Sequence, residues 1–434
     1  MRNKDRTKPK TWRKVKLGDI ANLFMQQVNP KNLGDIVVDH FSIPAFDAGR
    51  LPIRESASQI QSNKFVVPKG AVLLSKLNPR IPRVWKPIIQ KDIKALASTE
   101  FMVFVPKEDI DRDFLYYLFQ KRVFLATLAG QAGGTSTSHQ RAIPKAVLDS
   151  KVEIPTDINE QKRIANILSA FDEKIELNNK INQTLEEMAQ TIFKEWFIKF
   201  NFPVEFEVKS EKLKVKSLGY KDAGGKMVDR ELGKIPKGWE VKMLPEVFDF
   251  LEGPGIRNWQ YTSKGCPFIN IRLIQNNDID IKSASFISEE EANGKYKHFH
   301  LQERDMVVST SGTLGRSAIV RKEHLPLLLN TSVIRFRPKD RQSYAFMYQF
   351  LNSAYFQNKV LSMASGSAQP NFGPVHLKQI EVLVPDKETL KAFGVSVNPI
   401  YERIINIKSE NQKLASLRDL LLPKLMSGKI LVKS

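Results

Sequence analysis

Three loops of the chain combine hydrogen-bonding side chains with Gly and Ser: Gly133–Arg141, Ser309–Arg316 and Ser365–Asn371. Their residue types suit nucleic-acid binding, because Arg pairs with guanine, Gln and Asn pair with adenine, and Ser and Thr hold phosphate. The loop Ser309–Arg316 is similar to a nucleotide phosphate-binding loop but lacks the G-x-x-x-x-G-K-[ST] pattern, so nucleotide binding is not predicted. For any single residue, base contact, phosphate contact and a purely structural role all stay open.

The distribution of acidic residues supports the same chemistry. Two windows in each half of the chain contain no Asp or Glu: residues 56–91 and 114–148, then 306–322 and 341–380. A surface that faces DNA phosphates should exclude carboxylates, because they are repelled. A buried core also excludes acids and accounts for part of each window. It does not account for a basic cluster that includes Lys76 and Arg83, for which phosphate contact is predicted.

Together the loops and windows give a set of candidate DNA-binding residues. They are Lys76, Asn78, Arg80, Arg83, Thr135, Ser136, Thr137, His139, Gln140, Arg141, Thr310, Ser311, Thr313, Arg316, Ser365, Ser367, Gln369 and Asn371.

Catalytic motifs do not emerge from the sequence. There is no G-x-S-x-G elbow, H-E-x-x-H helix or CxxC pair. Asn29-Pro-Lys and Asn78-Pro-Arg lack the second Pro and the aromatic residue that would position an amino group for methylation. Glu160-Gln-Lys162 has nuclease-like spacing but lies in a helical pattern, where charge patterning explains it. We therefore expect a non-catalytic protein with no metal site and no cofactor of its own.

The overall composition indicates a partner that carries negative charge. The 434 residues hold a formal net charge of +20, and 42% of them are hydrophobic. Nucleic acid is the first expectation, and an anionic membrane surface is the alternative. One cysteine, Cys266, excludes a disulfide framework and a Cys-based zinc site and suits a reducing cytoplasm. The sequence contains no run of 18 apolar residues, so no transmembrane helix is predicted. The basic N-terminus lacks the apolar core of a secretory signal.

Two long helical patterns must position the loops. Residues 158–202 contain no Gly, and their apolar residues recur at helical spacing, as do those of Pro399–Met426. Shifting the first pattern by 229 positions superposes Asn182 on Asn411, a polar residue repeated on an apolar seam. The predicted seam consists of Ile164, Leu168, Phe171, Ile175, Asn178, Asn182, Leu185, Ile192, Ile400, Ile404, Ile407, Asn411, Leu414 and Leu421. Pro399 predicts that the second helix begins late or kinks.

The rest of the chain is also duplicated. Phe101–Lys107 aligns without gaps on Val333–Lys339 at a shift of 232, and each copy ends in a short apolar strand stopped by Pro155 or Pro385. Strands are expected at residues 65–67, 71–74, 101–105, 306–308 and 333–336, and helices at 113–128 and 344–363. The predicted order is a first domain (1–157), a long helix (158–202), a linker (203–236), a second domain (237–387) and a C-terminal helix with its tail (388–434).

Several phrases of this sequence resemble the specificity subunit of type I restriction-modification systems. They are Phe193–Pro203, Met227–Glu240, Leu420–Ile430 and the Ser-Gly-Thr-Leu-Gly loop at 311–315. The family often begins its helices with Glu-Gln-(Lys/Arg)-Arg-Ile, as at Glu160–Ile164, and the second helix departs from this start.

The resemblance implies an α+β fold, with two mixed α/β target-recognition domains and two long helices packed as an antiparallel coiled coil in a pseudo-two-fold repeat. It implies a non-catalytic DNA reader in the cytoplasm, in which each domain recognises one half of a bipartite target and the helices set the spacing. Two methyltransferase subunits would dock on it, and restriction subunits would join through them. These partners would use S-adenosylmethionine, ATP and Mg²⁺.

Two other functions remain open from the sequence. A basic scaffold on anionic membranes would require a basic amphipathic helix with exposed Trp or Leu, whereas the basic residues lie mostly in domains and loops. A fused methyltransferase–nuclease with unrecognised motifs would bind cofactor as the isolated chain.

Overall fold

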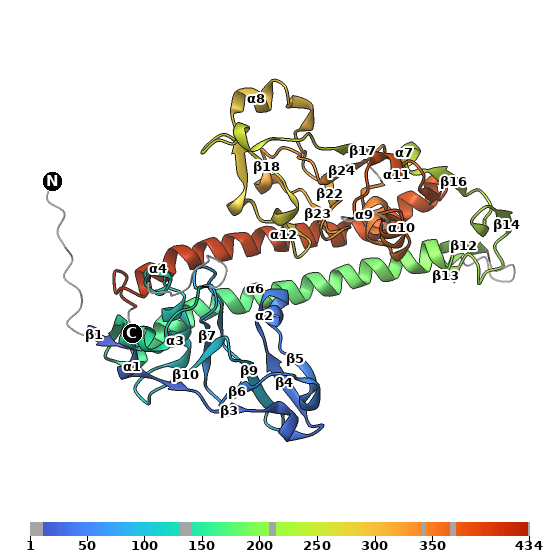
Figure 1. Cartoon of the computed structure of the whole chain (residues 1–434). Helices are drawn as coiled ribbons and strands as arrows, with labels where there is room; N and C mark the ends of the chain where they lie inside the picture. Colours follow the sequence, from blue (N-terminus) through green and yellow to red (C-terminus); the bar gives the residue numbers. More distant parts are fainter. Residues whose placement is uncertain (1–11, 131–139, 208–213, 341–342, 365–369, 433–434) are drawn as a thin grey trace. The chain divides into compact units, whose positions relative to one another are not determined.

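The structure is a computed structural model that describes residues 12–130, 140–207, 214–340, 343–364 and 370–432. The chain divides into two compact units (Figure 1). Unit 1 consists of residues 1–175 and 413–434, and unit 2 of residues 176–412. The boundary falls within both long helices, so each unit contains one domain together with one end of each helix. The units are described separately below.

Unit 1 is built on two sheets. Its four-stranded sheet has the order β2-β10-β7-β8, and its five-stranded sheet has the order β3-β6-β9-β4-β5. A separate pair, β1 with β11, joins the two ends of the domain in antiparallel register. The strands are β1 (Trp12–Lys16), β2 (Ala21–Phe24), β3 (Gln27–Val28), β4 (Val37–Phe41), β5 (Ile53–Ser56), β6 (Lys64–Val66), β7 (Val72–Ser75), β8 (Val84–Trp85), β9 (Lys94–Ser98), β10 (Phe101–Pro106) and β11 (Lys151–Pro155).

Unit 2 repeats this plan. The order β17-β24-β22-β23 matches β2-β10-β7-β8, and the pair β16 with β25 matches β1 with β11. Two small two-stranded sheets, β18 with β21 and β19 with β20, occupy the remainder of the domain. The strands are β16 (Glu240–Met243), β17 (Phe248–Glu252), β18 (Cys266–Phe268), β19 (Ile274–Gln275), β20 (Asp278–Ile279), β21 (Ser285–Ile287), β22 (Met306–Ser309), β23 (Ser317–Ile319), β24 (Val333–Pro338) and β25 (Glu381–Val384).

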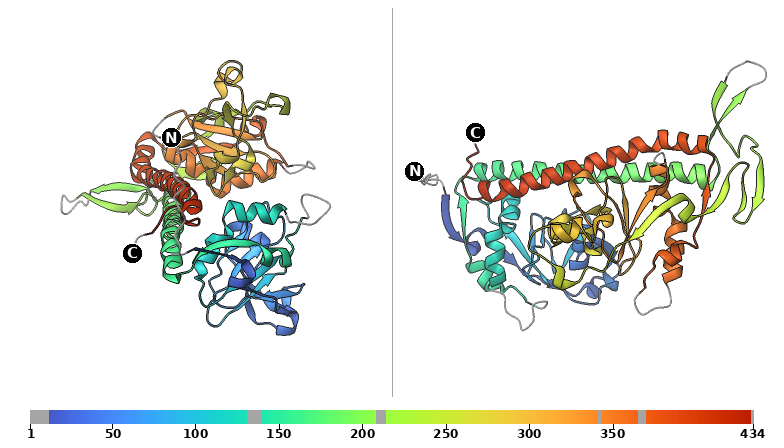
Figure 2. Two further views of the ribbon diagram at one scale, coloured as in Figure 1. Left: turned by 90° about the vertical axis from the view of Figure 1, so that its left-hand side faces the viewer. Right: turned by 90° about the horizontal axis from the view of Figure 1, so that it is seen from above.

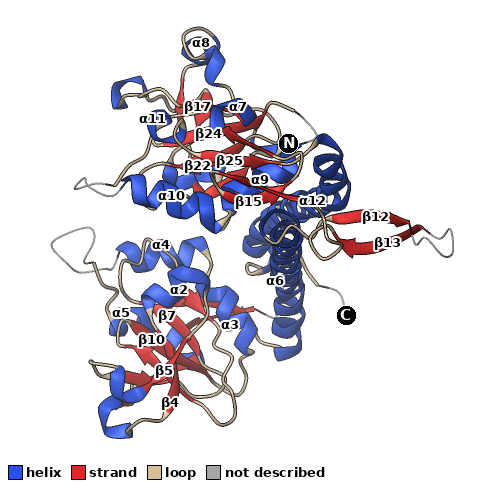
Figure 3. Ribbon diagram, turned by 90° about the vertical axis from the view of Figure 1, so that its right-hand side faces the viewer, coloured by secondary structure: helices blue, strands red, loops and turns tan. Residues whose placement is uncertain are grey.

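Helices cover one face of each four-stranded sheet (Figure 3). Along β7, Val72 and Leu74 join the core that contains the helices, whereas Leu73 joins the core on the opposite face. In β22, Met306 and Val308 face the helices, and Val307 faces away. This two-residue alternation is what a strand buried on both faces requires. The duplication predicted from sequence is therefore confirmed at the level of topology and core packing.

Each helix predicted after the central strand is two helices. In unit 1, α3 (Arg112–Phe119) begins where the Asp111 carboxylate accepts a hydrogen bond from the Phe114 N–H at 2.8 Å, and α4 (Arg122–Gly130) follows. In unit 2, α9 (Tyr344–Asn352) and α10 (Ala354–Ala364) are separated at Ser353. The helix is interrupted at Gln120 and Lys121 in unit 1 and at Ser353 in unit 2. The predictions of one continuous helix at 113–128 and at 344–363 were therefore wrong at these points.

The two long helices are α6 (Ile158–Phe193), followed by a π-helical turn at Lys194–Ile198, and α12 (Lys387–Leu425). The predicted late start of the second helix was wrong. Asp386 caps α12 by accepting from the Thr389 N–H at 2.8 Å, and the helix continues through Pro399. Proline leaves the carbonyl of Val395 without its helical donor. Val395 is 71% exposed, so water can satisfy that carbonyl.

Within each unit the helices pair antiparallel. In unit 1 the start of α6, with Ile164 and Leu168, packs on the end of α12, with Leu422 and Leu425. In unit 2 the end of α6 packs on the start of α12, where Phe193 and Phe393 lie 6.1 Å apart. All predicted seam residues are buried or half-buried. The predicted fold class, including the antiparallel coiled coil, is confirmed.

The polar seam residues have a pairing that the sequence repeat did not suggest. Asn178 Nδ2 donates to Asn411 Oδ1 at 2.8 Å, and Asn411 Nδ2 donates to Asn179 at 2.9 Å. Asn182, which superposes on Asn411 in the repeat, is 6% exposed, and its Oδ1 meets no partner among the described residues. The shift of 229 positions identifies residues that are equivalent in the two copies. Because the two helices run antiparallel, equivalent residues need not contact each other, and Asn411 meets Asn178 instead of Asn182.

The segment after α6 forms two hairpins in place of the predicted linker without regular structure. They are β12 (Pro203–Glu207) with β13 (Lys214–Gly219), and β14 (Met227–Arg230) with β15 (Gly233–Pro236). Figure 2 shows the first hairpin leading away from the C-terminal end of α6. The charged, glycine-dotted composition hid the strands, because a two-stranded hairpin needs no continuous apolar pattern. In the described parts of the chain, no helix is long and apolar enough to cross a membrane.

Candidate DNA-recognition surfaces

The structure brings the two acid-free windows of unit 1 together. The loop after β7 and the segment before α5 (Pro144–Asp149) form a bridge between Leu77 and Arg141. The Asn78 N–H donates to the Gln140 carbonyl at 2.8 Å, and the Ala142 N–H donates to the Lys76 carbonyl at 2.8 Å. The candidates Asn78 and Gln140, 62 positions apart in sequence, are thus held side by side by a backbone hydrogen bond. We call this pair of segments the unit 1 reading loops.

Unit 2 makes the same pairing at the corresponding place. The loop after β22 bridges to the segment before α11 (Pro374–Leu377) through Ser311 and Asn371, and the Phe372 N–H donates to the Thr310 carbonyl at 3.2 Å. These segments are the unit 2 reading loops. Because the strands that lead into both pairs are equivalent in topology, the two domains present equivalent loop pairs.

Side chains and glycines shape the loop Ser309–Arg316. Ser309 Oγ donates to the Thr313 carbonyl at 2.6 Å and accepts from the Arg316 N–H at 3.0 Å. Gly312 and Gly315 have φ of 65° and 74°, a region that favours glycine. At Gly315 a Cβ would also lie 2.1 Å from Gln357 Oε1. The two glycines of the Ser-Gly-Thr-Leu-Gly sequence are therefore required by the backbone of the loop.

The candidate residues differ in their availability. Arg80, Thr313 and Arg316 are exposed, and neither Arg forms an ion pair with a described residue. Thr310 is buried, with its Oγ1 lacking a partner among the described residues, so its side chain is closed to DNA in this conformation. The remaining candidates, Thr135, Ser136, Thr137, His139, Ser365, Ser367 and Gln369, lie outside the described residues.

Three basic residues of the acid-free windows have acidic partners. Arg83 donates twice to Asp47, at 2.7 and 2.8 Å, and Arg141 donates twice to Glu100, at 3.0 and 3.1 Å. Lys86 lies 3.0 Å from Asp113. All three carboxylates come from outside the acid-free windows. An acid-free stretch of sequence is therefore not an acid-free surface, because folding supplies partners from elsewhere. Arg83 is already neutralised, whereas Lys76 has no ion-pair partner among the described residues.

Equivalent contacts fasten each domain to its helices. In unit 1, Tyr117 of α3 donates to Asp172 of α6 at 2.6 Å, and Arg418 of α12 pairs with the same carboxylate at 2.5 Å. Burial, reinforced by the nearby Asp172, raises the pKa of Tyr117. In unit 2, Gln349 of α9 donates to Tyr401 of α12 at 2.8 Å. Gln349 and Tyr401 occupy the positions that Tyr117 and Asp172 occupy in the first copy, at shifts of 232 and 229.

Further hydrogen bonds connect the start of α6 to the domain of unit 1. Trp12 donates from its indole to Glu160 at 3.1 Å. The fully buried Gln161 donates to the carbonyls of Asp109 and Pro155 and accepts from the Asp111 N–H. The sequence singled out Glu160 and Gln161 for their nuclease-like spacing with Lys162 and as part of the helix start common in the resembling family. Their role is to connect the domain's last strand to the helix.

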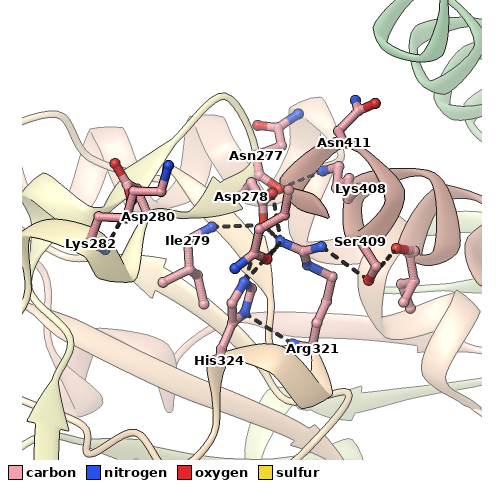
Figure 4. Close-up of polar contacts among 12 residues, drawn as sticks. Asn277, Asp278, Ile279, Asp280, Lys282, Arg321, His324, Lys408, Ser409 and Asn411 are labelled. Carbon is pink, nitrogen blue, oxygen red and sulfur yellow. Dashed lines mark hydrogen bonds and ion pairs between the residues drawn. The ribbon is translucent and has the colours of Figure 1, made fainter. Parts of the chain in front are cut away.

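Unit 2 also contains a buried polar cluster between its domain and α12 (Figure 4). The guanidinium of Arg321, 2% exposed, contacts Asp278 at 2.9 Å, Ser409 at 3.1 Å and Gln412 at 3.2 Å. Its Nη2 also lies 3.0 Å from Nε2 of His324, which is 1% exposed. Burial, with Arg321 as the next cause, lowers the pKa of His324 to about 4.

Lys408 of α12 extends the cluster. It donates to the Asn277 carbonyl at 2.6 Å, and burial lowers its pKa. The sequence did not predict a role for Arg321 or Lys408. From sequence alone, a buried basic residue on a helix or after a strand cannot be distinguished from an exposed one. Spacing gives no signal for these two residues, because the partners that hold them include Asp278, 43 residues from Arg321, and Asn277, 131 residues from Lys408.

No group of three or more His, Cys, Asp and Glu side chains suited to a metal occurs in the part of the chain that the structure describes. Cys266 is buried, and burial raises the pKa of its thiol.

Comparison with known proteins identifies the family. A family model described as the type I restriction modification DNA specificity domain matches residues 9–187 and again residues 236–416. The HindI specificity subunit of Haemophilus influenzae is 26% identical, covering 96% of this chain and 99% of that protein. The MjaIX specificity subunit of Methanocaldococcus jannaschii is 27% identical, covering 94% and 87%.

A solved structure shares the fold. The S subunit of a type I restriction-modification system from M. genitalium superposes with a TM-score of 0.52 at 16% identity, covering 98% of both chains. The two halves matched by the family model are the two halves that the topology shows to be duplicated. The chain therefore belongs to the family of type I restriction-modification DNA specificity domains and carries that domain twice.

Proposed function

We propose that the chain is the DNA-specificity subunit of a type I restriction-modification complex, in which each domain recognises one half of a bipartite DNA target. The observation that carries the proposal is the pair of equivalent reading loops, held by the same backbone pairing in two copies of one domain. Two related readers on one chain suit a target with two halves. The net charge of +20 suits its phosphates.

The subunit itself is non-catalytic in this proposal. Methylation and cleavage belong to partner subunits, which use S-adenosylmethionine, ATP and Mg²⁺. Two methyltransferase subunits dock on the long helices, and restriction subunits join through them. Both helices carry exposed apolar side chains suited to such docking, Leu177 and Met188 on α6 and Val395, Leu417 and Leu420 on α12. A hollow of about 690 Å³ on α12, lined by residues that include Gly394, Val395 and Pro399, offers a site for a partner side chain.

The test is methylome sequencing of cells that express the chain with its methyltransferase. A bipartite methylated motif is expected, with both halves lost when the chain is omitted. Exchanging residues 237–386 for the second domain of a relative should change one half and preserve the other. A continuous motif, or exchange that alters both halves, would contradict two independent readers.

A second experiment tests the proposal that the helices set the spacing. Inserting seven residues after Ile175 and seven after Gln412, at the boundary between the units, adds one heptad to each helix and preserves the seam on both sides. At ~1.5 Å per residue the addition is ~10 Å, near three base pairs of DNA. The non-specific spacer should lengthen while the bases read in each half stay the same. An unchanged spacer in an active complex would show that the helices do not set it.

A further inference from the structure

A second exposed segment of unit 2 has the chemistry of a DNA contact. Residues 257–264, Arg-Asn-Trp-Gln-Tyr-Thr-Ser-Lys, are all exposed except Gln260. Trp259 is 81% exposed, an unusual state for an indole that proteins normally bury. No Asp or Glu occurs from Gly253 to Asn277. Basic residues interleaved with exposed aromatic ones are typical of nucleic-acid surfaces. None of these residues is among the candidate DNA-binding residues predicted from the sequence.

The segment is held in place from beneath. Gln260, 5% exposed, donates to Glu291 at 2.8 Å and to the Tyr296 hydroxyl at 3.0 Å. Its Oε1 accepts the Arg257 N–H at 3.0 Å. These bonds fix the short turn that carries Trp259, and so the indole is presented outward on a supported backbone. A supported, exposed aromatic loses little conformational entropy on binding, which is why such residues often dominate recognition surfaces.

The base of the segment lies against the unit 2 reading loops. The Thr331 N–H donates to the Pro254 carbonyl at 3.0 Å, and the Ile256 N–H donates to the Asn330 side chain at 3.3 Å. The next residue, Ser332, accepts the Thr310 N–H at 2.9 Å. Residues 330–332 therefore contact the stretch before Arg257 on one side and the loop after β22 on the other. A duplex engaged by the reading loops would meet the 257–264 segment as its neighbour.

We propose that residues 257–264 form an additional DNA-contacting element of the second domain, in which Trp259 packs against bases of one half-site and Arg257 and Lys264 contact phosphates. Neither basic residue forms an ion pair with a described residue, so both charges are available to DNA. The inference rests on the proposed function, because it assigns the element to the half-site that this domain reads. A lone exposed Trp could also contact a protein partner, but the basic side chains of Arg257 and Lys264 on the same segment favour a polyanion.

The experiment uses the complete complex of the chain with its methyltransferase and double-stranded DNA carrying the methylated motif. W259A should weaken binding at least about 5-fold, the loss expected when an interface aromatic worth more than ~1 kcal/mol is truncated, and relax the half read by unit 2. W259F keeps a ring and should retain most of the affinity. R257A/K264A should weaken binding to all sequences and reduce the salt dependence by about one ion per lost phosphate contact. L51A is the matched control, since Leu51 is 75% exposed and lies in unit 1, outside the acid-free windows.

Fluorescence gives a direct readout of the contact. Trp85, Trp196 and Trp239 are buried and Trp12 is half-buried, so Trp259 is the one exposed Trp of the five. The difference signal between wild type and W259F should become protected from acrylamide when target DNA is added.

Protection by methyltransferase alone, without a change on adding DNA, would make the segment a protein contact and overturn the inference. Unchanged affinity and motif in W259A, with the wild-type complex active, would also overturn it. A wild-type complex that methylates no bipartite motif would instead contradict the proposed function.

Discussion

Lowering the pH should loosen unit 2 through His324. The ring nitrogens lie 3.1 Å from the Arg321 backbone nitrogen and 3.0 Å from its guanidinium, so a second proton on the ring would face donors and positive charge. Arg321 and Lys408 oppose protonation, whereas Asp278 and Glu323 favour it, and burial is the largest cause of the lowered pKa. Protonation would therefore be costly in the folded state.

The sign and size follow from proton linkage. The pKa of the ring falls from 6.5 to about 4 on folding. The unfolded chain thus binds more protons between these values, and the free energy of unfolding falls as the pH falls through this window. The full loss is about 3 kcal/mol, complete below the folded pKa, and about 2 kcal/mol is already lost at pH 5.

Urea unfolding in a W12F/W85F/W259F background can measure this loss, because Trp196 and Trp239 both lie in the core of unit 2. Carboxylates also titrate in this range, so the quantity to compare is the change between pH 7.5 and pH 5 in wild type and in H324Q. A glutamine accepts hydrogen bonds but takes up no proton, and H324Q should lose about 2 kcal/mol less than wild type. H298Q, at an exposed histidine of the same unit, should behave as wild type. Equal losses in wild type and H324Q would refute the reasoning.

Three further outcomes are expected. Q140A should relax one half of the methylated motif and N371A the other, each at ~1–3 kcal/mol of discrimination; a single variant that relaxes both halves in methylome sequencing would contradict separate readers. D172N removes the negative charge that pairs with Arg418 and one of the two oxygens that accept from Tyr117 and Arg418. It should destabilise unit 1 by ~1–3 kcal/mol in urea unfolding followed at Trp12 and Trp85, whereas the exposed neighbour change E173Q should have little effect. N178L alone should lower the melting temperature by leaving a polar partner unpaired, and N178L/N411L should restore or raise it; a further fall in the double variant would show that the Asn pair stabilises the helices.

The sequence by itself determined the architecture. The repeat at shifts of 229 and 232, the apolar seam and the short strands before Pro155 and Pro385 were sufficient for two related domains and two long helices. These features are local periodicities or direct self-similarity, which survive without knowledge of the fold. The family resemblance came from short phrases of sequence, and Glu160 and Gln161 show the structural role of one of them, because both side chains are fixed at the junction of strand and helix.

Only the tertiary structure decided which charges are free and which residues meet. Arg83 and Arg141 belong to acid-free windows, yet Asp47 and Glu100 reach them from other parts of the chain. Arg321 is buried because Asp278, Ser409 and Gln412 converge on it from distant positions. Pro399 does not stop α12, because packing of the helix against unit 2 outweighs a local preference worth ~3 kcal/mol. Pairings across long sequence separations depend on the path of the chain, and composition and spacing carry no record of it.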